Sequence, residues 1–162
     1  MVINCDELKE DGRKCYMQIS GIKLPKMDFG LFSKSDPYLQ IFRQSNQSWI
    51  KIYQTEVIPK TLDPRWKPIT LKVADMCGGD EKRRILFRVW DHDKVGSHDL
   101  IGEFQLTLGD IKQGSRFGLR RPKKKKDKNY GHLEFSEAKH YRDANFLDYI
   151  RGGMEVNVMY AI

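Results

Sequence analysis

The sequence predicts an all-β protein, an eight-stranded antiparallel β-sandwich. Apolar and polar residues alternate with a period of two along most of the chain, which is typical of strands that bury one face. Glycine, proline, aspartate and serine separate these segments at short intervals. The chain has 162 residues, 40% hydrophobic and 31% charged, so a single folded domain with a proper core is expected.

Eight alternating segments are expected to form the strands. In chain order they are Val2–Leu8, Cys15–Ser20, Tyr38–Phe42, Trp49–Tyr53, Ile69–Val73, Ile85–Trp90, Glu103–Leu108 and Leu133–Phe135. The segment Thr61–Trp66 is expected to be a turn that returns the chain, with Trp66 as its anchor. A long polar segment, Gly109–Lys128, is expected to be a surface loop.

The C-terminal end differs from the rest of the chain. Asp143–Ile150 is the best helix candidate, and two glycines follow it. Met154–Tyr160 alternates again, with no partner strand visible in the sequence. We therefore expect residues 1–140 to form the sandwich, and residues 141–162 to be a connector and the first strand of a further domain in a longer protein.

Nothing in the sequence indicates export or a membrane span. No apolar run approaches the ~20 residues that cross a bilayer, and the N-terminus does not resemble a signal peptide. Cys5, Cys15 and Cys77 lack the spacing of metal ligands. These observations favour a reducing, cytoplasmic setting.

The strand Ile85–Trp90 leads directly into a cluster of acids. Asp91 and Asp93 stand one residue apart, and Asp99 follows across a turn that contains Gly96. Carboxylates this close repel one another, and a cation between them removes the repulsion. Oxygen ligands on a short, bendable loop suit Ca²⁺ better than Mg²⁺.

A second acidic loop lies upstream, between Met27 and Tyr38. It carries Asp28 and Asp36, and it also ends where a strand begins. Two acidic loops at strand ends predict one shared metal-binding cup.

The acids around Asp91 admit three other interpretations. An EF-hand loop would need a ligand at Val95 and a glutamate at Gly102, so it is excluded. The Asp-x-Asp-x-Val pattern of Asp91–Val95 resembles the nucleophile motif of aspartate-dependent phosphohydrolases, but a strand and a basic loop follow where those enzymes need helices. No enzymatic activity is therefore expected. Unliganded turn aspartates remain an alternative.

Four motifs occur in the order and spacing of a C2 domain. They are Leu24–Asp28, Ser35–Tyr38, Thr61–Trp66, and Trp90–Asp93 through Asp99–Glu103. A narrower resemblance, to the second C2 domain of a copine, rests on Phe32–Pro37, Gly96–Phe104 and Phe146–Gly153. This resemblance implies that residues 141–162 lead into a von Willebrand A-like domain.

The resemblance also implies the metal ligands. Asp36, Asp91, Asp93 and Asp99 match four of the five carboxylate positions that hold Ca²⁺ in C2 domains. The fifth position is Gly30, which has no side chain to offer. Asp28, two residues earlier, is the candidate substitute, and a ring short of one carboxylate would bind Ca²⁺ more weakly.

A C2 domain of this kind is expected to bind anionic phospholipid when Ca²⁺ is bound, and to move from the cytoplasm to the plasma membrane in signalling. The expected membrane-inserting side chains are Phe29, Leu31, Phe32 and Val95. Core packing of at least one of the first three remains open.

A basic run, Arg120–Lys128, contains seven basic residues and one acid, and thus supplies +6 of the net charge of +7. The residues expected to meet anionic lipid are Lys94, Lys123, Lys124, Lys125 and Lys126, at about 1 kcal/mol each near the surface. A merely solvated loop is an equal alternative. Nucleic acid is not expected, because no aromatic residue is interleaved and no RNA-binding fingerprint accompanies the run.

The alternative function from another class is a protein-interaction module whose cup is too degenerate to bind Ca²⁺ usefully. Protein targets would then be reached through the parent chain. In either case we expect a monomer.

Overall fold

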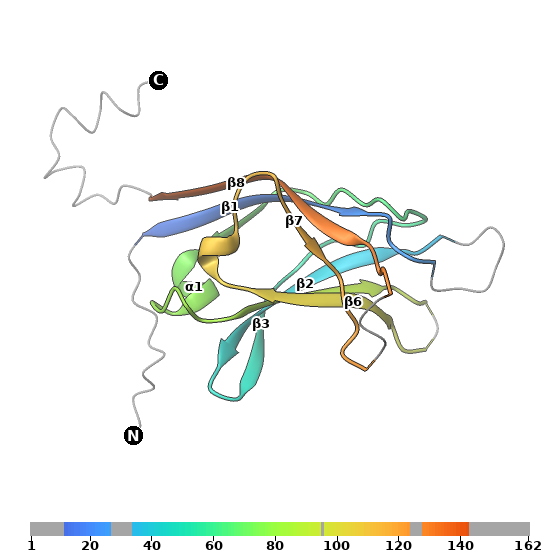
Figure 1. Ribbon diagram of the computed structural model, residues 1–162, viewed down its shortest axis with the longest axis horizontal. Helices are drawn as coiled ribbons and strands as arrows, with labels where there is room; N and C mark the ends of the chain where they lie inside the picture. Colours follow the sequence, from blue (N-terminus) through green and yellow to red (C-terminus); the bar gives the residue numbers. More distant parts are fainter. Residues whose placement is uncertain (1–11, 27–33, 95, 124–127, 143–162) are drawn as a thin grey trace, which may run out of the picture.

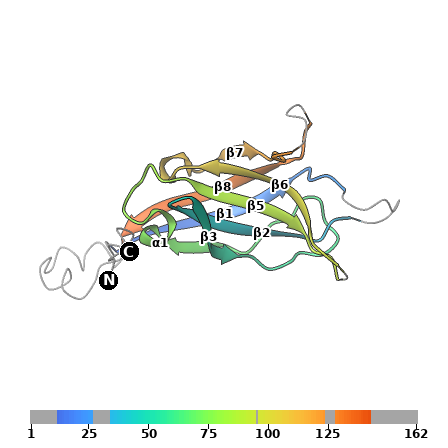
Figure 2. The same cartoon turned by 90° about the horizontal axis from the view of Figure 1, so that it is seen from below.

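The computed structural model describes residues 12–26, 34–94, 96–123 and 128–142, and these form a sandwich of two antiparallel sheets (Figures 1 and 2). The first sheet has the order β4 (Ile69–Lys72), β1 (Arg13–Ile22), β8 (His132–Arg142) and β7 (Ser115–Gly118). The second has the order β3 (Ser48–Gln54), β2 (Pro37–Ser45), β5 (Ile85–Asp91) and β6 (Asp99–Leu106). The predicted fold class is confirmed.

The core lies between the sheets and follows the alternation of the sequence. In β1, Cys15, Met17 and Ile19 are completely buried, and the inward row of β5 is equally buried. Full burial of one such side chain stabilises the fold by roughly 1.5–3 kcal/mol. Trp66 anchors its turn as predicted, because its ring is buried and its Nε1 donates to the Pro37 carbonyl at 3.3 Å.

Stacked aromatic rings join the two sheets beside β7. The Phe104 ring stacks on Phe87 and on Phe117 at 5.2 Å between centroids, and Phe135 meets both Phe87 and Phe117 edge to face. Such pairs add about 0.5–1.5 kcal/mol beyond area burial. These rings fix β7, from the first sheet, against β6, from the second.

The segment Gly109–Lys128, expected to be a loop throughout, contains β7. This strand has four residues and one large apolar side chain, Phe117, so it shows no alternation in the sequence. Its pairing with β8 and the packing of Phe117 hold it in place. A 3-10 helix, η1 (Leu108–Asp110), starts at the end of the strand expected over Glu103–Leu108.

A short helix, α1 (Val73–Cys77), begins where the sequence predicted the end of a strand. Its side chains Val73, Ala74, Met76 and Cys77 are buried, so tertiary packing outweighs local alternation here. Gly78, with a φ of 61°, ends the helix in a left-handed conformation, and its N–H bonds back to Ala74.

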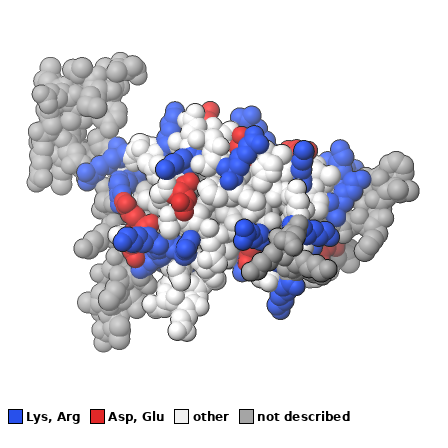
Figure 3. Space-filling view, in the orientation of Figure 1, with Lys and Arg blue, Asp and Glu red and all other residues white. Residues whose placement is uncertain are grey.

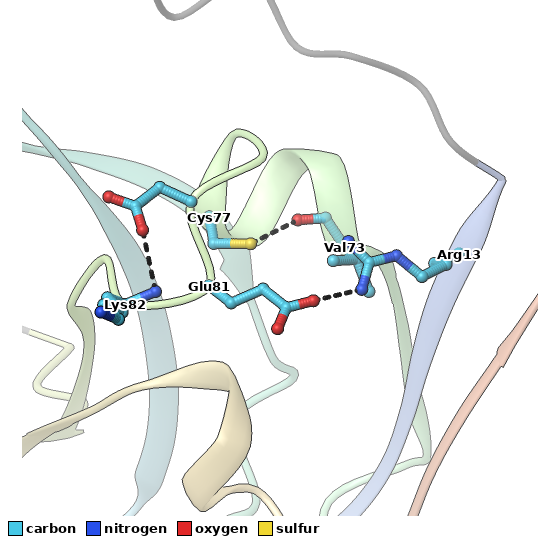
Figure 4. Close-up of polar contacts among 6 residues, drawn as sticks. Arg13, Val73, Cys77, Glu81 and Lys82 are labelled. Carbon is cyan, nitrogen blue, oxygen red and sulfur yellow. Dashed lines mark hydrogen bonds and ion pairs between the residues drawn. The ribbon is translucent and has the colours of Figure 1, made fainter.

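The turn after α1 is tied to β1 (Figure 4). Arg13 pairs with Glu81, the Cys77 thiol donates to the Val73 carbonyl at 3.3 Å, and the Lys82 N–H donates to Asp80 at 3.0 Å. Burial raises the pKa of Cys77 and raises the pKa of Cys15 to about 12, so both thiols stay protonated.

Several expected elements lie outside the described residues. These are the strand Val2–Leu8, the helix Asp143–Ile150 and the strand-like segment Met154–Tyr160. The division at residue 140 therefore stays a prediction. In the described ranges no helix combines the length and apolar character that crossing a bilayer requires.

Candidate metal centre

Strand pairing brings the predicted acidic residues to one end of the sandwich. Asp91, at the end of β5, lies opposite Pro37 at the start of β2 and opposite Asp99 at the start of β6. Paired residues in antiparallel strands have Cα atoms about 4.5–5.5 Å apart. In Figure 1 these strand ends and the loop between β5 and β6 lie at the right-hand end, away from α1. The position of three acids is thus a consequence of the register.

Asp36 and Asp91 are held in place by backbone hydrogen bonds. The Asp36 N–H donates to Asp91 Oδ1 at 2.8 Å, and the His92 N–H donates to the Asp36 carbonyl at 2.9 Å. A second contact comes from Lys60, whose N–H donates to Asp36 Oδ1 at 2.7 Å. Lys60 has a φ of 54°, the left-handed conformation that few side chains adopt. One oxygen of each carboxylate is therefore oriented by the main chain.

The other two acids are exposed, and aromatic rings support their loop. The Asp93 N–H donates to His98 Nδ1 at 3.2 Å, so the neutral imidazole carries its proton on Nε2. The His92 and His98 rings lie 4.7 Å apart, and Tyr38 meets His98 edge to face at 5.6 Å. Burial raises the pKa of Tyr38, which keeps its phenol neutral.

The four carboxylates do not form a closed cage. Within the described ranges, no three His, Cys, Asp or Glu side chains lie close enough together to hold a metal ion. Carboxylate oxygens nevertheless are the ligands that a hard cation such as Ca²⁺ takes. The strands therefore place the right donors at one end, while the side chains have not converged on a common point.

Much of the first acidic loop lies outside the described residues. This holds for Asp28, Phe29, Gly30, Leu31 and Phe32, and in the other loop for Val95. The two ends of the first loop are described and joined, since Ser35 Oγ donates to the Pro25 carbonyl at 3.1 Å. The fifth ligand and the apolar tips thus stay predictions.

The described ends of the basic run lie at the same end of the sandwich as the acids. Arg121 Nε donates to the Ile101 carbonyl at 2.9 Å, near the start of β6, and its guanidinium lies 4.4 Å from the centre of the Tyr130 ring. Where the chain returns from the basic run into β8, Gly131 has a φ of 81°. The Cβ of any other residue at this position would lie 2.9 Å from the Ile22 carbonyl oxygen.

The expected lipid-facing bases are only partly described. Lys94 and Lys123 are exposed, and Lys124–Lys126 lie outside the described residues. Figure 3 shows Lys and Arg side chains at the right-hand end of the face in view, and also over its left half and upper edge. Acidic loops and basic side chains therefore share one end of the molecule.

Sequence reasoning missed the partners that orient the acids. Lys60 acts through its backbone N–H, which no residue type reveals, and it lies 24 positions from Asp36. No role was predicted for His98, yet its Nδ1 accepts a hydrogen bond from the backbone N–H of Asp93. A histidine directly before Asp99 was the only signal of this role in the sequence.

Comparison with known proteins decides the family. Residues 12–122 match the family model of the C2 domain. The chain belongs to the C2 domain family. The predicted resemblance to copines is also confirmed: the chain is 38% identical to Copine-B of Dictyostelium discoideum over 167 residues, and 38% identical to Copine-E of the same organism over 165 residues. Both matches cover 99% of the chain, but the chain spans only 31% and 28% of those copines.

Solved structures of C2 domains share the fold. A structure described as BON1-C2B is 26% identical, with a TM-score of 0.67, and the match covers 82% of this chain and 94% of that one. The first C2 domain of plant Extended Synaptotagmin 1 has a TM-score of 0.60 at 22% identity, over 83% of this chain and 97% of that one. A calcium-bound structure of the two C2 domains of Extended Synaptotagmin 2 has a TM-score of 0.56 at 21% identity, over 81% of this chain and 45% of that one.

Proposed function

We propose that this C2 domain binds anionic phospholipid membranes in a Ca²⁺-dependent manner. The proposed ligands are Asp36, Asp91, Asp93 and Asp99. The observation that carries the proposal is the strand register, which sets Asp91 opposite both Pro37 and Asp99 and so gathers acids from two loops at one end. The calcium-bound Extended Synaptotagmin 2 structure supports the fold alone at 21% identity, so the proposal rests on the acids themselves.

The proposed mechanism is electrostatic. Without metal, the clustered carboxylates repel a negatively charged membrane. Bound Ca²⁺ would supply positive charge at this end and an open coordination position for a lipid phosphate. The backbone N–H groups of Asp36 and Lys60 hold two of the carboxylates in place, so that part of the ligand set is oriented in advance.

Side chains around the acids are proposed to contact the membrane directly. Phe29, Leu31, Phe32 and Val95 would enter the headgroup region once the acidic charge is neutralised. Lys94 and Lys123–Lys126 would face the anionic leaflet. The anchoring of Arg121 beside the start of β6 supports this orientation, because it keeps the basic run at the end that carries the acids.

Asp28 is proposed as the fifth ligand in place of the glycine at position 30. We further propose that the domain is a monomer that performs no covalent chemistry. In the parent protein it would move from the cytoplasm to the plasma membrane when Ca²⁺ rises.

Sedimentation with vesicles tests this function. The chain is mixed with vesicles of phosphatidylserine and phosphatidylcholine, with Ca²⁺ or with a chelator, and the bound fraction is measured by centrifugation. Pure phosphatidylcholine vesicles serve as the control for charge. We expect binding only with both Ca²⁺ and phosphatidylserine, and equal binding with and without Ca²⁺ would refute the proposal.

A second candidate function is a protein-interaction module that does not bind Ca²⁺ usefully. One observation favours it: among the described residues no three potential ligands are grouped closely enough for a metal. Titration calorimetry with Ca²⁺ alone separates the two candidates. A measurable heat of Ca²⁺ binding supports the membrane function. The absence of heat at millimolar Ca²⁺, together with vesicle binding that does not depend on Ca²⁺, supports the interaction module.

A further inference from the structure

A hollow of about 220 Å³ lies near the end of the sandwich that carries α1, and it is lined by Arg43, Ile50, Ile52 and Asp75. These residues come from β2, β3 and α1, far from the acidic loops. Arg43 lies six residues along β2 from Pro37, or about 20 Å at 3.3 Å per residue. A ligand here would not compete with a membrane at the other end.

Arg43 is the unusual group in this hollow. Leu39 and Ile41, which precede it on the same face of β2, are completely buried, so Arg43 extends an inward-facing apolar row. Its Nε and Nη1 atoms are shielded from solvent, and neither has a hydrogen-bond partner among the described residues. Buried donors without acceptors are unfavourable, and a guanidinium is best satisfied by a carboxylate. Asp75 lines the same hollow but accepts no bond from these two atoms.

The remaining lining is aliphatic and accessible. Ile50 lies opposite Arg43 in the strand register and is 40% exposed. In the pairing of β2 with β3, Ile41 lies opposite Tyr53 and Phe42 opposite Lys51, so Ile52 has no partner residue. This marks a β-bulge in β3 next to the hollow. An engineered cavity of about 150 Å³ holds benzene, so a hollow of this size can hold one side chain of moderate length.

The edge of the second sheet runs beside the hollow. β3 pairs with β2 on one side, and within the described ranges no strand pairs with its other side. Unpaired backbone groups on an edge strand can pair with an extended segment of another protein, whose alternate side chains then reach the same face.

We propose that this hollow is a docking site for an extended segment of a partner protein that inserts an acidic side chain against Arg43. Aliphatic side chains of that segment would pack on Ile50 and Ile52. The ligand chemistry follows from the lining: a cation without a partner among the described residues calls for a carboxylate, and the two isoleucines call for apolar neighbours of that carboxylate.

The test uses an acetylated, amidated probe peptide, Val-Thr-Glu-Thr-Val, in which both valines share the face of the glutamate, with its Glu-to-Gln analogue as matched control. The 162-residue chain is titrated in chelator without vesicles, so the outcome is independent of the membrane function. Nuclear magnetic resonance follows the methyl groups of Ile50 and Ile52 and the Nε–H of Arg43. We expect the Glu peptide to shift all three signals and the Gln peptide to bind about ten-fold more weakly.

Two variants locate the effect. Arg43→Met keeps the aliphatic stem and removes the charge, so both peptides should bind this variant equally weakly. Lys51→Met removes a cation on the adjacent strand, β3, and should retain the preference for Glu. If Arg43→Met does not fold, the variant Ile50→Thr at the exposed rim is used instead. We expect Ile50→Thr to weaken the binding of the Glu peptide.

Three results would overturn the proposal. The first is the absence of any shift at millimolar Glu peptide. The second is equal affinity of the two peptides for the unmodified chain. The third is an equal response to isovalerate, a free branched carboxylic acid, because the hollow would then be a site for small acids and not for a protein segment.

Discussion

Asp91 differs from the other acids at its end of the molecule because it is 5% exposed and bonded to the Asp36 N–H, whereas Asp93 and Asp99 are exposed. A buried carboxylate held by a backbone amide is oriented before any ion arrives, and exposed carboxylates must turn toward it. Substitutions at Asp91 therefore need an isosteric replacement that keeps this hydrogen bond.

The double substitution Asp91→Asn with Asp93→Asn should abolish Ca²⁺-dependent sedimentation with anionic vesicles. Asparagine retains Oδ1 as an acceptor for the Asp36 N–H, so the fold should survive, and the removal of two repelling charges should not lower the midpoint of urea unfolding. The matched control is Asp75→Asn with Glu137→Gln, which changes the net charge equally but far from the loops. Ca²⁺-dependent sedimentation that persists in the first variant would contradict the ligand assignment.

Gly30→Asp should tighten Ca²⁺ binding, because the affinity of such sites follows the number of charged ligands. Asp28→Asn tests whether the nearby acid already serves as the fifth ligand. Both positions lie outside the described residues, so the titration midpoint is the measure. If Gly30→Asp leaves the midpoint unchanged and Asp28→Asn weakens binding, Asp28 is the ligand. If neither changes it, the first loop contributes only Asp36.

The sequence indicated which acids face the loops but not what orients them. Asp36 and Asp91 could be predicted because each stands where an alternating strand begins or ends. Lys60 could not, since its contribution is a backbone N–H from a distant loop. For Arg43, alternation with Leu39 and Ile41 indicates the face, but only the structure shows that its Nε and Nη1 have no hydrogen-bond partner among the described residues.

Among the elements, β7 and α1 could not be predicted, although the equally short β4 could, and β8 was predicted only over Leu133–Phe135 of its eleven residues. β1, β2 and β5 alternate over several residues, and their buried rows match the apolar positions. β3 was also predicted from its alternation, but its residues are half-buried or exposed. β7 has four residues and one large apolar side chain, and α1 has five residues, so neither period shows in them. Tertiary contacts decide such segments, as the packing of Phe117 in β7 illustrates.

The 3-10 helix η1 has a capping box that makes its stability depend on pH. Asp110 accepts hydrogen bonds from the N–H and the hydroxyl of Thr107 at 2.8 and 3.0 Å. These bonds lower the pKa of Asp110 below its usual value of 3.8, the backbone bond being the larger cause. A lowered folded-state pKa stabilises the fold above the unfolded-state pKa, and this contribution is lost as pH falls through the folded-state value.

Asp110→Ala should therefore lower the free energy of unfolding by about 1 kcal/mol at neutral pH, as the loss of a helix cap does. The difference from the unmodified chain should shrink at acidic pH, as the pH falls from the usual value of 3.8 through the lowered folded-state pKa and the carboxylate becomes protonated. Urea unfolding at neutral and at acidic pH measures this difference in the free energy of unfolding. Glu137→Ala, on the exposed face of β8, is the control and should change little. A difference that is the same at both pH values would show that the charge of Asp110 is not involved.

At the scale of the whole molecule, the two ends of the sandwich carry different chemistry. Acidic loops and the basic run share one end, and the hollow at Arg43 lies near the other. In the proposed orientation the first end faces the membrane while the second faces the cytoplasm, so one domain could hold a membrane and a protein segment at once.

Salt should separate the contribution of the basic run from that of the apolar tips. Exposed charges are screened within about 10 Å at 0.1 M salt, whereas the burial of apolar side chains is not screened in this way. Replacement of Lys123–Lys126 by Ala should lower affinity for anionic vesicles and flatten its salt dependence. Replacement of Phe29 and Phe32 by Ala should weaken binding and leave the salt dependence intact. Both variants should still require Ca²⁺.

Vesicle sedimentation across a salt series measures the membrane affinity of both variants. Identical binding of the lysine variant and the unmodified chain at every salt concentration would contradict a membrane role for the run. The run would then be a solvated loop.

The pairing of β1 with β8 sets the order in which this domain can fold during synthesis. Ser136 on β8 bonds to the Gln18 carbonyl on β1 across 118 positions of the chain, and these two strands are the central pair of the first sheet. Until Phe135 has left the ribosome, the inner strand β1 lacks β8 on one side, and the apolar side chains that β8 contributes to the core are not yet in place. Contacts this distant make folding slow, and emerging chains expose unpaired strand edges meanwhile. Until β8, the last strand of the described residues, has emerged, the nascent domain exposes an unpaired edge that other chains can bind.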